Sequence, residues 1–200
     1  KKRESFKQIE NLIKSGAKII DIGGESTRPG SKTIHPKIEW RRVEKVIRNF
    51  KKRYNKMCLS FDTRKLNLMV KGIKSGVDLI NDVSGFDYDK ESVKNLKKYK
   101  IPKVLHHMQG TPQDMQKNPK YKNVLLDIYD YFENKINNQF NDKKIILDPG
   151  IGFGKTLKHN LTLLSKISLF HSLGFPILLG TSRKRFINQI SGEYDSKDRT

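Results

Sequence analysis

The chain has 200 residues and a formal net charge of +20, with 35% hydrophobic and 31% charged residues. This length is enough for one domain with a buried core, so we expect a single domain over residues 1–200. Apolar segments recur along the whole chain, which argues against disorder. No apolar run approaches the roughly 18–20 residues that span a bilayer, and no signal-peptide pattern opens the chain, so we expect no membrane partner.

The high positive charge is compatible with binding to nucleic acid or to an anionic surface. The basic residues are, however, spread along the chain and are not gathered into one stripe interleaved with aromatic residues. A diffuse positive field also suits a small anionic substrate, so we expect no specific nucleic-acid partner. The lone Cys58 excludes an internal disulfide framework and fits the reducing cytoplasm.

Short apolar segments alternate with amphipathic segments along the chain. The six apolar segments predict strands at 17–22, 57–61, 77–80, 103–105, 145–147 and 177–179. The amphipathic segments predict helices before the first strand and between or after the others, with Pro36 opening one helix and glycines 16, 76 and 174 ending three. This alternation predicts a parallel α/β sheet, and both an open doubly wound sheet and a closed (β/α)₈ barrel fit it.

Polar side chains stand at or directly after the ends of these predicted strands. They are Asp21, Asp62, Asn81 with Asp82, His106 with His107, Asp148, and Ser182 to Lys184. Any one of the carboxylates could cap a helix or a turn. In parallel α/β folds, however, the loops at the carboxyl ends of the strands build the active site. One concave polar site explains the whole series more simply than independent caps do.

Several short motifs fail as signatures of other sites. Residues 154–156 resemble the end of a phosphate-binding P-loop, but the required first glycine is replaced by Pro149. His106 and His107 are adjacent and would point in opposite directions on an extended chain, so they are poor partners for one metal ion. Cys58 lies inside an apolar strand and is interpreted as a core residue.

Six motifs together resemble the dihydropteroate synthase family of pterin-binding enzymes, in the family's order and over nearly the whole chain. They are Asp-Ile-Gly-Gly-Glu-Ser-Thr-Arg-Pro-Gly at 21–30, Phe-Asp-Thr at 61–63, Ile-Asn-Asp-Val-Ser-Gly at 80–85, His-Met-Gln-Gly-Thr-Pro at 107–112, Asp-Pro-Gly-Ile-Gly-Phe-Gly-Lys at 148–155 and Ser-Arg-Lys at 182–184. The resemblance implies a (β/α)₈ TIM barrel. It also implies a transferase of folate biosynthesis, which condenses 6-hydroxymethyl-7,8-dihydropterin diphosphate with 4-aminobenzoate to give 7,8-dihydropteroate and diphosphate.

The resemblance also implies roles for individual residues. The pterin would be bound by Asp62, Asn81, His106, Asp148 and Lys184, of which Asp62, Asp148 and Lys184 are the catalytic candidates. The diphosphate and 4-aminobenzoate would be bound by Thr27, Arg28, Pro29, Phe153 and Ser182. This assignment is chemically reasonable, because carboxylates and an amide can read the guanidine-like edge of a pterin.

The chain departs from the family's pattern in three respects. His106 stands where the family usually has a Met packed on the pterin. The family's first strand, which carries the Asn that binds Mg²⁺, and its last strand, with an Arg and a His for diphosphate, have no counterpart here. We therefore expect about six of the eight βα units, Mg²⁺ as the cofactor but no metal ligand within this chain, and poor turnover or none by the chain alone. Family members are commonly dimers, so we also expect a possible homodimer.

Three rival interpretations remain. One is an inactive or truncated pterin-binding remnant. Another is a barrel similar to methyltetrahydrofolate methyltransferases, which also bind pterins through acidic residues but do not need the Ser-Thr-Arg-Pro-Gly loop beside Ser-Arg-Lys. A basic nucleic-acid-binding module is the third.

Overall fold

The computed structural model describes residues 2–140 and 144–192, so both ends of the predicted domain lie outside the described residues. Five parallel strands form one sheet in sequence order, which confirms the predicted parallel α/β class. The strands are β1 (Ile19–Gly23), β2 (Cys58–Asp62), β3 (Leu79–Asp82), β4 (Lys103–His106) and β5 (Ile145–Asp148). A sheet that keeps the sequence order and is crossed by helices on one side is the geometry of a barrel wall.

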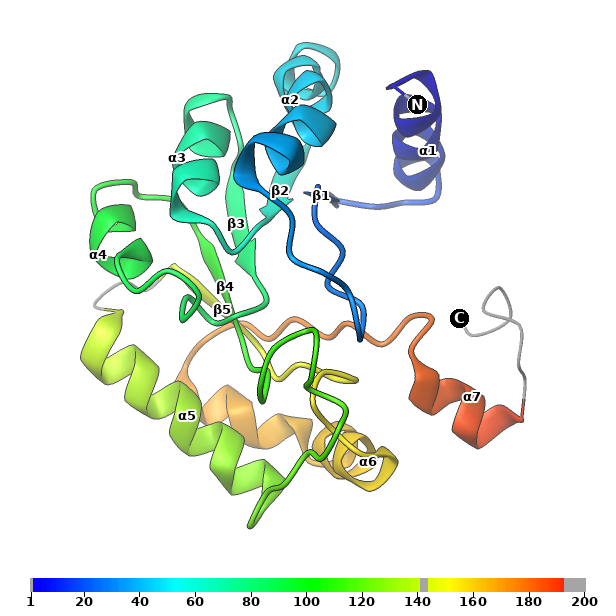
Figure 1. Ribbon diagram of the computed structural model, residues 1–200, viewed down its shortest axis with the longest axis vertical. Coiled ribbons are helices and arrows are strands. Elements are labelled where there is room, and N and C mark those ends of the chain that lie inside the picture. The colour runs from blue at the N-terminus through cyan, green and yellow to red at the C-terminus, as the bar shows by residue number, and fades with distance from the viewer. Residues whose placement is uncertain (1, 141–143, 193–200) are drawn as a thin grey trace.

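Helices connect successive strands and follow one another around the outside of the sheet (Figure 1). They are α1 (Lys2–Lys14), α2 (Pro36–Arg53), α3 (Leu66–Lys74), α4 (Ser92–Leu96), α5 (Val124–Gln139), α6 (Leu157–Ser165) and α7 (Arg185–Ser191). A 3₁₀ helix, Ile167–Leu173, continues from α6 and ends at Gly174, whose φ of 80° is in the left-handed region. None of the helices in the described ranges is long and apolar enough to cross a membrane.

The predicted sixth strand at 177–179 is reduced to a single parallel bridge between Ile177 and Leu147. The carbonyl of Pro176 accepts a hydrogen bond from the Leu147 amide, and the Leu178 amide donates to the Leu147 carbonyl, both at 2.8 Å. The apolar segment is short, and it lies between a proline, which has no amide hydrogen, and Gly180. Pro176 has no amide hydrogen to donate to β5, so the ladder does not extend in that direction, and the prediction of a full strand there was wrong.

The two faces of the sheet differ in chemistry. Phe61, Ile80, Leu105 and Leu147 are 0% exposed and point from β2 to β5 toward the helices, where they form the core. Side chains alternate along a strand, so their neighbours in sequence point to the inner face. Asp21, Asp62, Asn81, His106 and Asp148 lie on that inner face, away from the helices.

Asn123 begins the long helix α5, and its side-chain oxygen accepts hydrogen bonds from the amides of Leu125 and Leu126. We expect Asn123→Ala to lower the free energy of unfolding by about 1 kcal/mol, because two amides of the first turn lose their acceptor. Asn138→Ala, at an exposed position of the same helix, is the control and should be nearly neutral. Equal losses in urea denaturation would contradict the capping role.

Candidate active site

The strand register brings four of the five predicted pterin residues to one face of the sheet. Asp62 pairs with Asn81 across β2 and β3, Asn81 pairs with Val104 of β4, and His106 pairs with Asp148 across β4 and β5. Residues paired across a ladder point the same way, and Val104 and His106 are two apart in one strand. Asp62, Asn81, His106 and Asp148 therefore all project from the inner face near the carboxyl ends of their strands.

The same alternation turns other strand-end residues away from this face. Asp82 is fully buried on the helix side, where its carboxylate accepts hydrogen bonds from the amide and hydroxyl of Ser84 at 2.8 and 2.6 Å. It is thus a turn cap, the simple alternative that the sequence left open. His107 also turns away and packs edge-on against Tyr131. The polar series at the strand ends accordingly combines inward-facing site residues with outward-facing caps.

Asp62 and Asn81 present unused hydrogen-bonding capacity on the inner face. No described residue donates a hydrogen bond to the Asp62 carboxylate, and its enclosure by the protein, together with the nearby charge of Asp21, raises its pKa well above the usual range. Asn81 donates through Nδ2 to Asp21 at 3.2 Å, while its buried Oδ1 finds no partner among the described residues. An unpaired carboxylate beside an unpaired amide oxygen is suited to a ligand edge rich in N–H groups.

Asp148 and Lys184 join this polar face to a neighbouring cavity. Asp148 Oδ1 accepts the Gly150 amide at 2.8 Å, which leaves Oδ2 free to face the interior. The Lys184 ammonium lies 4.0 Å from the centre of the Phe153 ring, and its pKa is lowered because burial disfavours the charge, while Asp148 partly offsets this. Arg183, in the middle of the Ser-Arg-Lys turn, has a φ of 57°, which is uncommon for a residue with a side chain.

The cavity has a volume of about 970 Å³ and is lined by all five residues predicted for the diphosphate and 4-aminobenzoate side, namely Thr27, Arg28, Pro29, Phe153 and Ser182, together with Lys184. Among the described residues, five cationic side chains line it, Arg28, Lys155, Arg183, Lys184 and Arg185, and no carboxylate does. A cavity with this lining is complementary to an anionic ligand.

The loop that carries residues 25–34 is fixed to the body of the protein at its base. Glu25, with a side chain only 5% exposed, accepts from Arg64 and Lys65, and its Oε2 also accepts the Ile34 amide at 2.9 Å. The Lys65 ammonium in turn pairs with the fully buried Glu39. Further along, the Gly30 amide donates to the Pro112 carbonyl at 2.8 Å, which ties this loop to the loop after β4.

The chain is similar in sequence to known proteins. The sequence profile of the family described as pterin binding enzyme matches residues 1–200. The dihydropteroate synthase of Synechocystis sp. is 36% identical over 196 residues, which cover 96% of this chain and 68% of that protein. That of Clostridium beijerinckii is 40% identical over 187 residues, which cover 92% and 66%. The chain belongs to the dihydropteroate synthase family. It spans about two thirds of the length of these relatives.

Solved structures of dihydropteroate synthases have the same fold. The Yersinia pestis enzyme, in complex with a sulfonamide drug, superimposes with a TM-score of 0.94 at 33% identity, covering 100% of this chain and 73% of that one. The Xanthomonas albilineans enzyme with 4-aminobenzoic acid gives a TM-score of 0.91 at 31% identity, covering 100% and 71%. The predicted family and the predicted fold, a partial (β/α)₈ barrel, are thereby confirmed.

Sequence reasoning missed the residues that support the dihydropteroate synthase loops. Lys155 was noted as the end of the 148–155 motif and in a failed P-loop match, but no role was assigned to it. It is 3% exposed and donates to His107 Nδ1 and to the carbonyls of His107 and Phe153. It therefore links the loops after β4 and β5. Glu25, Arg64 and Lys65 lie within or beside the quoted motifs, so the signal was present, but only the fold reveals that they pair.

Burial of Lys155, with Lys184 nearby, lowers the pKa of its ammonium from 10.5 to about 7. Between these values the unfolded chain binds more protons than the folded one, so the free energy of unfolding should rise with pH. The free energy of unfolding of the native protein, measured relative to that of Lys155→Met, should increase by about 1 kcal/mol per pH unit from pH 7.5 to 9. Lys166→Met, at an exposed position, is the control. A difference that stays constant in urea titrations across this range would contradict the prediction.

Proposed function

We propose that this chain forms the pterin- and 4-aminobenzoate-binding part of a dihydropteroate synthase. The observation that carries the proposal is the meeting of a polar face, bearing Asp62, Asn81 and Asp148, with a cation-lined cavity at Lys184. The polar face is complementary to the guanidine-like edge of 6-hydroxymethyl-7,8-dihydropterin diphosphate. The cavity is complementary to its diphosphate and to the carboxylate of 4-aminobenzoate.

The reaction would break the bond between the pterin methylene carbon and the diphosphate oxygen. The bonding electrons leave with the diphosphate, and the resulting pterin cation is stabilised by resonance. The amine of 4-aminobenzoate then forms the new C–N bond and loses a proton. Asp62 and Asp148 would stabilise positive charge developing on the ring, and Arg28 and Lys184 would stabilise the departing anion. No nucleophilic side chain is required on this route.

Three finer assignments remain predictions. Mg²⁺ is implied by the family, but the described residues contain no group of three or more His, Cys, Asp or Glu side chains arranged to hold a metal ion, so no step is derived through it. The homodimer likewise rests on the resemblance alone. A cytoplasmic location is proposed from the free thiol of Cys58, which is partly buried in β2.

The proposal is tested by calorimetric titration of the chain with 6-hydroxymethylpterin and with 4-aminobenzoate, and by chromatographic assay for dihydropteroate after incubation with 6-hydroxymethyl-7,8-dihydropterin diphosphate and 4-aminobenzoate. Binding of both ligands with formation of product supports a synthase. Binding of both without product supports the remnant interpretation, and binding of methyltetrahydrofolate with no response to 4-aminobenzoate supports the methyltransferase-like one.

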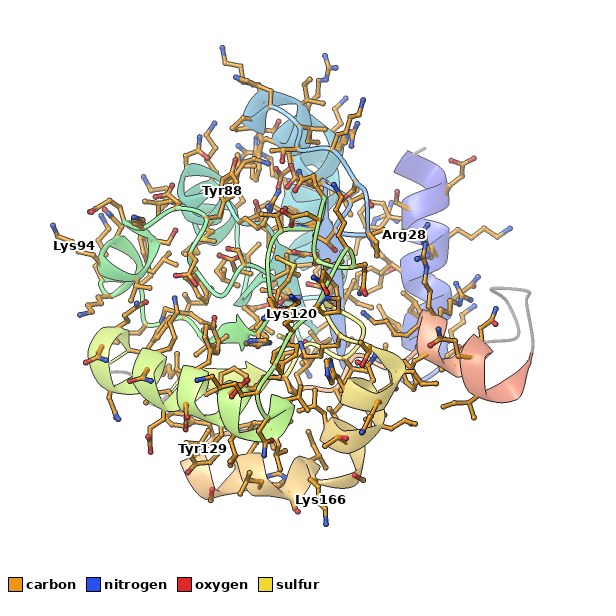
Figure 2. All side chains as sticks on the ribbon, turned by 60° about the horizontal axis from the view of Figure 1, so that its bottom comes forward. Arg28, Tyr88, Lys94, Lys120, Tyr129 and Lys166 are labelled. Atoms are coloured by element: carbon orange, nitrogen blue, oxygen red, sulfur yellow. The ribbon has the colours of Figure 1, made fainter. Side chains whose placement is uncertain are left out.

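A nucleic-acid-binding module would instead bind oligonucleotides with a steep dependence on salt. Against it, the basic side chains lie on different faces of the molecule, and Lys94 and Lys166 extend outward from separate parts of its rim (Figure 2). Absence of pterin binding under all conditions would contradict the proposed function.

A further inference from the structure

His106 is a buried histidine with one ring nitrogen in use and the other without a partner. The side chain is 2% exposed, and Nδ1 lies 2.9 Å from the Val83 carbonyl oxygen. A carbonyl oxygen can only accept, so Nδ1 carries the hydrogen. Nε2 is buried and has no hydrogen-bond partner among the described residues. In the neutral ring this atom is a lone-pair acceptor.

The neutral state follows from the surroundings. Burial and the nearby ammonium groups of Lys155 and Lys184 lower the pKa of His106 to about 4, against the opposing effect of Asp148. At neutral pH, therefore, Nε2 offers a lone pair and not a proton. It lies 4.0 Å from Asp148 Oδ2, which also faces the interior and is an acceptor.

Two acceptors at this separation do not bind each other, but a donor placed between them can bind both. The ring is held in position by an edge-on contact with Phe153, whose centre is 4.6 Å away, so Nε2 cannot turn to another partner without losing the Val83 bond. The arrangement leaves a buried, oriented acceptor unsatisfied until a donor arrives, which is costly for the empty site.

We infer that His106 Nε2 and Asp148 Oδ2 form a pair of acceptors for an N–H group on the guanidine-like edge of the pterin. His106 would then determine specificity by accepting a hydrogen bond from the pterin, whereas a residue that only packs on the pterin ring would not distinguish a donor there. This inference rests on the proposed function. A thioether at the same position would be a much weaker acceptor, so the contact is specific to the histidine.

The binding test compares the native chain with His106→Met and His106→Phe. Both variants keep an apolar side chain against Phe153 but lack the acceptor. We expect each to bind 6-hydroxymethylpterin roughly fivefold more weakly, the effect of one hydrogen bond. If the imidazole served only for stacking, His106→Phe would bind at least as tightly as the native chain, and that result would overturn the inference.

The second readout is the ¹⁵N spectrum of the histidine rings, which is insensitive to a small change in stability. In the free protein we expect His106 to carry its hydrogen on Nδ1, and His107, whose Nδ1 accepts from Lys155, to carry it on Nε2. Addition of pterin should move the Nε2 signal of His106 and leave His107, the internal control, in place.

The outcomes separate the inference from the function on which it rests. Pterin binding to the native chain with an unmoved His106 Nε2 signal would overturn the inference alone. Failure of the native chain to bind pterin would overturn both. A free protein in which His106 carries its hydrogen on Nε2 would also overturn the inference, because the acceptor would then be absent.

Discussion

Replacement of Lys65 by methionine is expected to lower the free energy of unfolding by about 3–5 kcal/mol. The Lys65 ammonium lies between the carboxylates of Glu25, at 2.7 Å, and Glu39, and all three side chains are at most 5% exposed. Without the ammonium, two buried carboxylates lose their shared cation. Among the described residues, Glu25 then keeps Arg64 and the Ile34 amide, and Glu39 keeps only the Thr63 hydroxyl. The loss is a large part of the stability of an ordinary domain.

Chemical denaturation followed by circular dichroism measures this effect. The matched control is Arg48→Met, which removes an exposed pair with Glu44 on α2 and should cost less than about 1 kcal/mol. The double variant Lys65→Met with Glu39→Gln should recover part of the loss, because it removes one of the unpaired charges while the amide oxygen can still accept from Thr63. Similar losses for Lys65→Met and Arg48→Met would contradict the buried network.

Replacement of Asp148 by asparagine should weaken binding of 6-hydroxymethylpterin roughly 30-fold, or about 2 kcal/mol. Asparagine retains an oxygen that can accept the Gly150 amide, so the turn after β5 keeps its hydrogen bond. What is lost is the charge and the acceptor at Oδ2, the atom that faces the inner surface. The change therefore separates ligand binding from local folding.

Calorimetric titration checks this prediction, and thermal unfolding of the same samples checks that the fold is retained. Asp130→Asn, at an exposed position of α5, is the matched control and should leave pterin affinity unchanged. If Asp148→Asn bound pterin as tightly as the native chain, the polar face would have to be assigned to another ligand or to none.

The elements that sequence reasoning predicted well are those whose pattern is local. Alternation of apolar strands with amphipathic helices indicated the five strands and their parallel direction, because parallel strands need helical crossovers. The pattern left their order open, since it fits both a doubly wound sheet and a barrel, and the structure shows the order of a barrel. The segment at 177–179 was overestimated for the opposite reason. Its apolar composition is local, but whether it forms a ladder depends on the amide donors of its neighbours, and Pro176 supplies none.

At the site, the residue types could be predicted, but the side of the sheet to which each side chain points could not. Asn81 and Asp82 are adjacent, and only the strand register reveals that the amide faces inward while the carboxylate caps the turn at Ser84. His106 was assigned to the pterin by resemblance, but its free nitrogen depends on the position of the Val83 carbonyl, 23 residues away. The ion pairs of Glu25 likewise join segments about 40 residues apart.

The loop of residues 25–34 is anchored at Glu25, so for protein engineering its residues fall into two classes: the anchor and the residues of the cavity wall. Changes at Glu25 will register as poor expression or low melting temperature, whereas changes at Thr27, Arg28 or Pro29 alter the cavity wall without touching the anchor. A mutant library sorted first for thermostability would thus retain variation at the tip of the loop and eliminate it at the base. Substrate range could be explored in such a library without repeated loss of the fold.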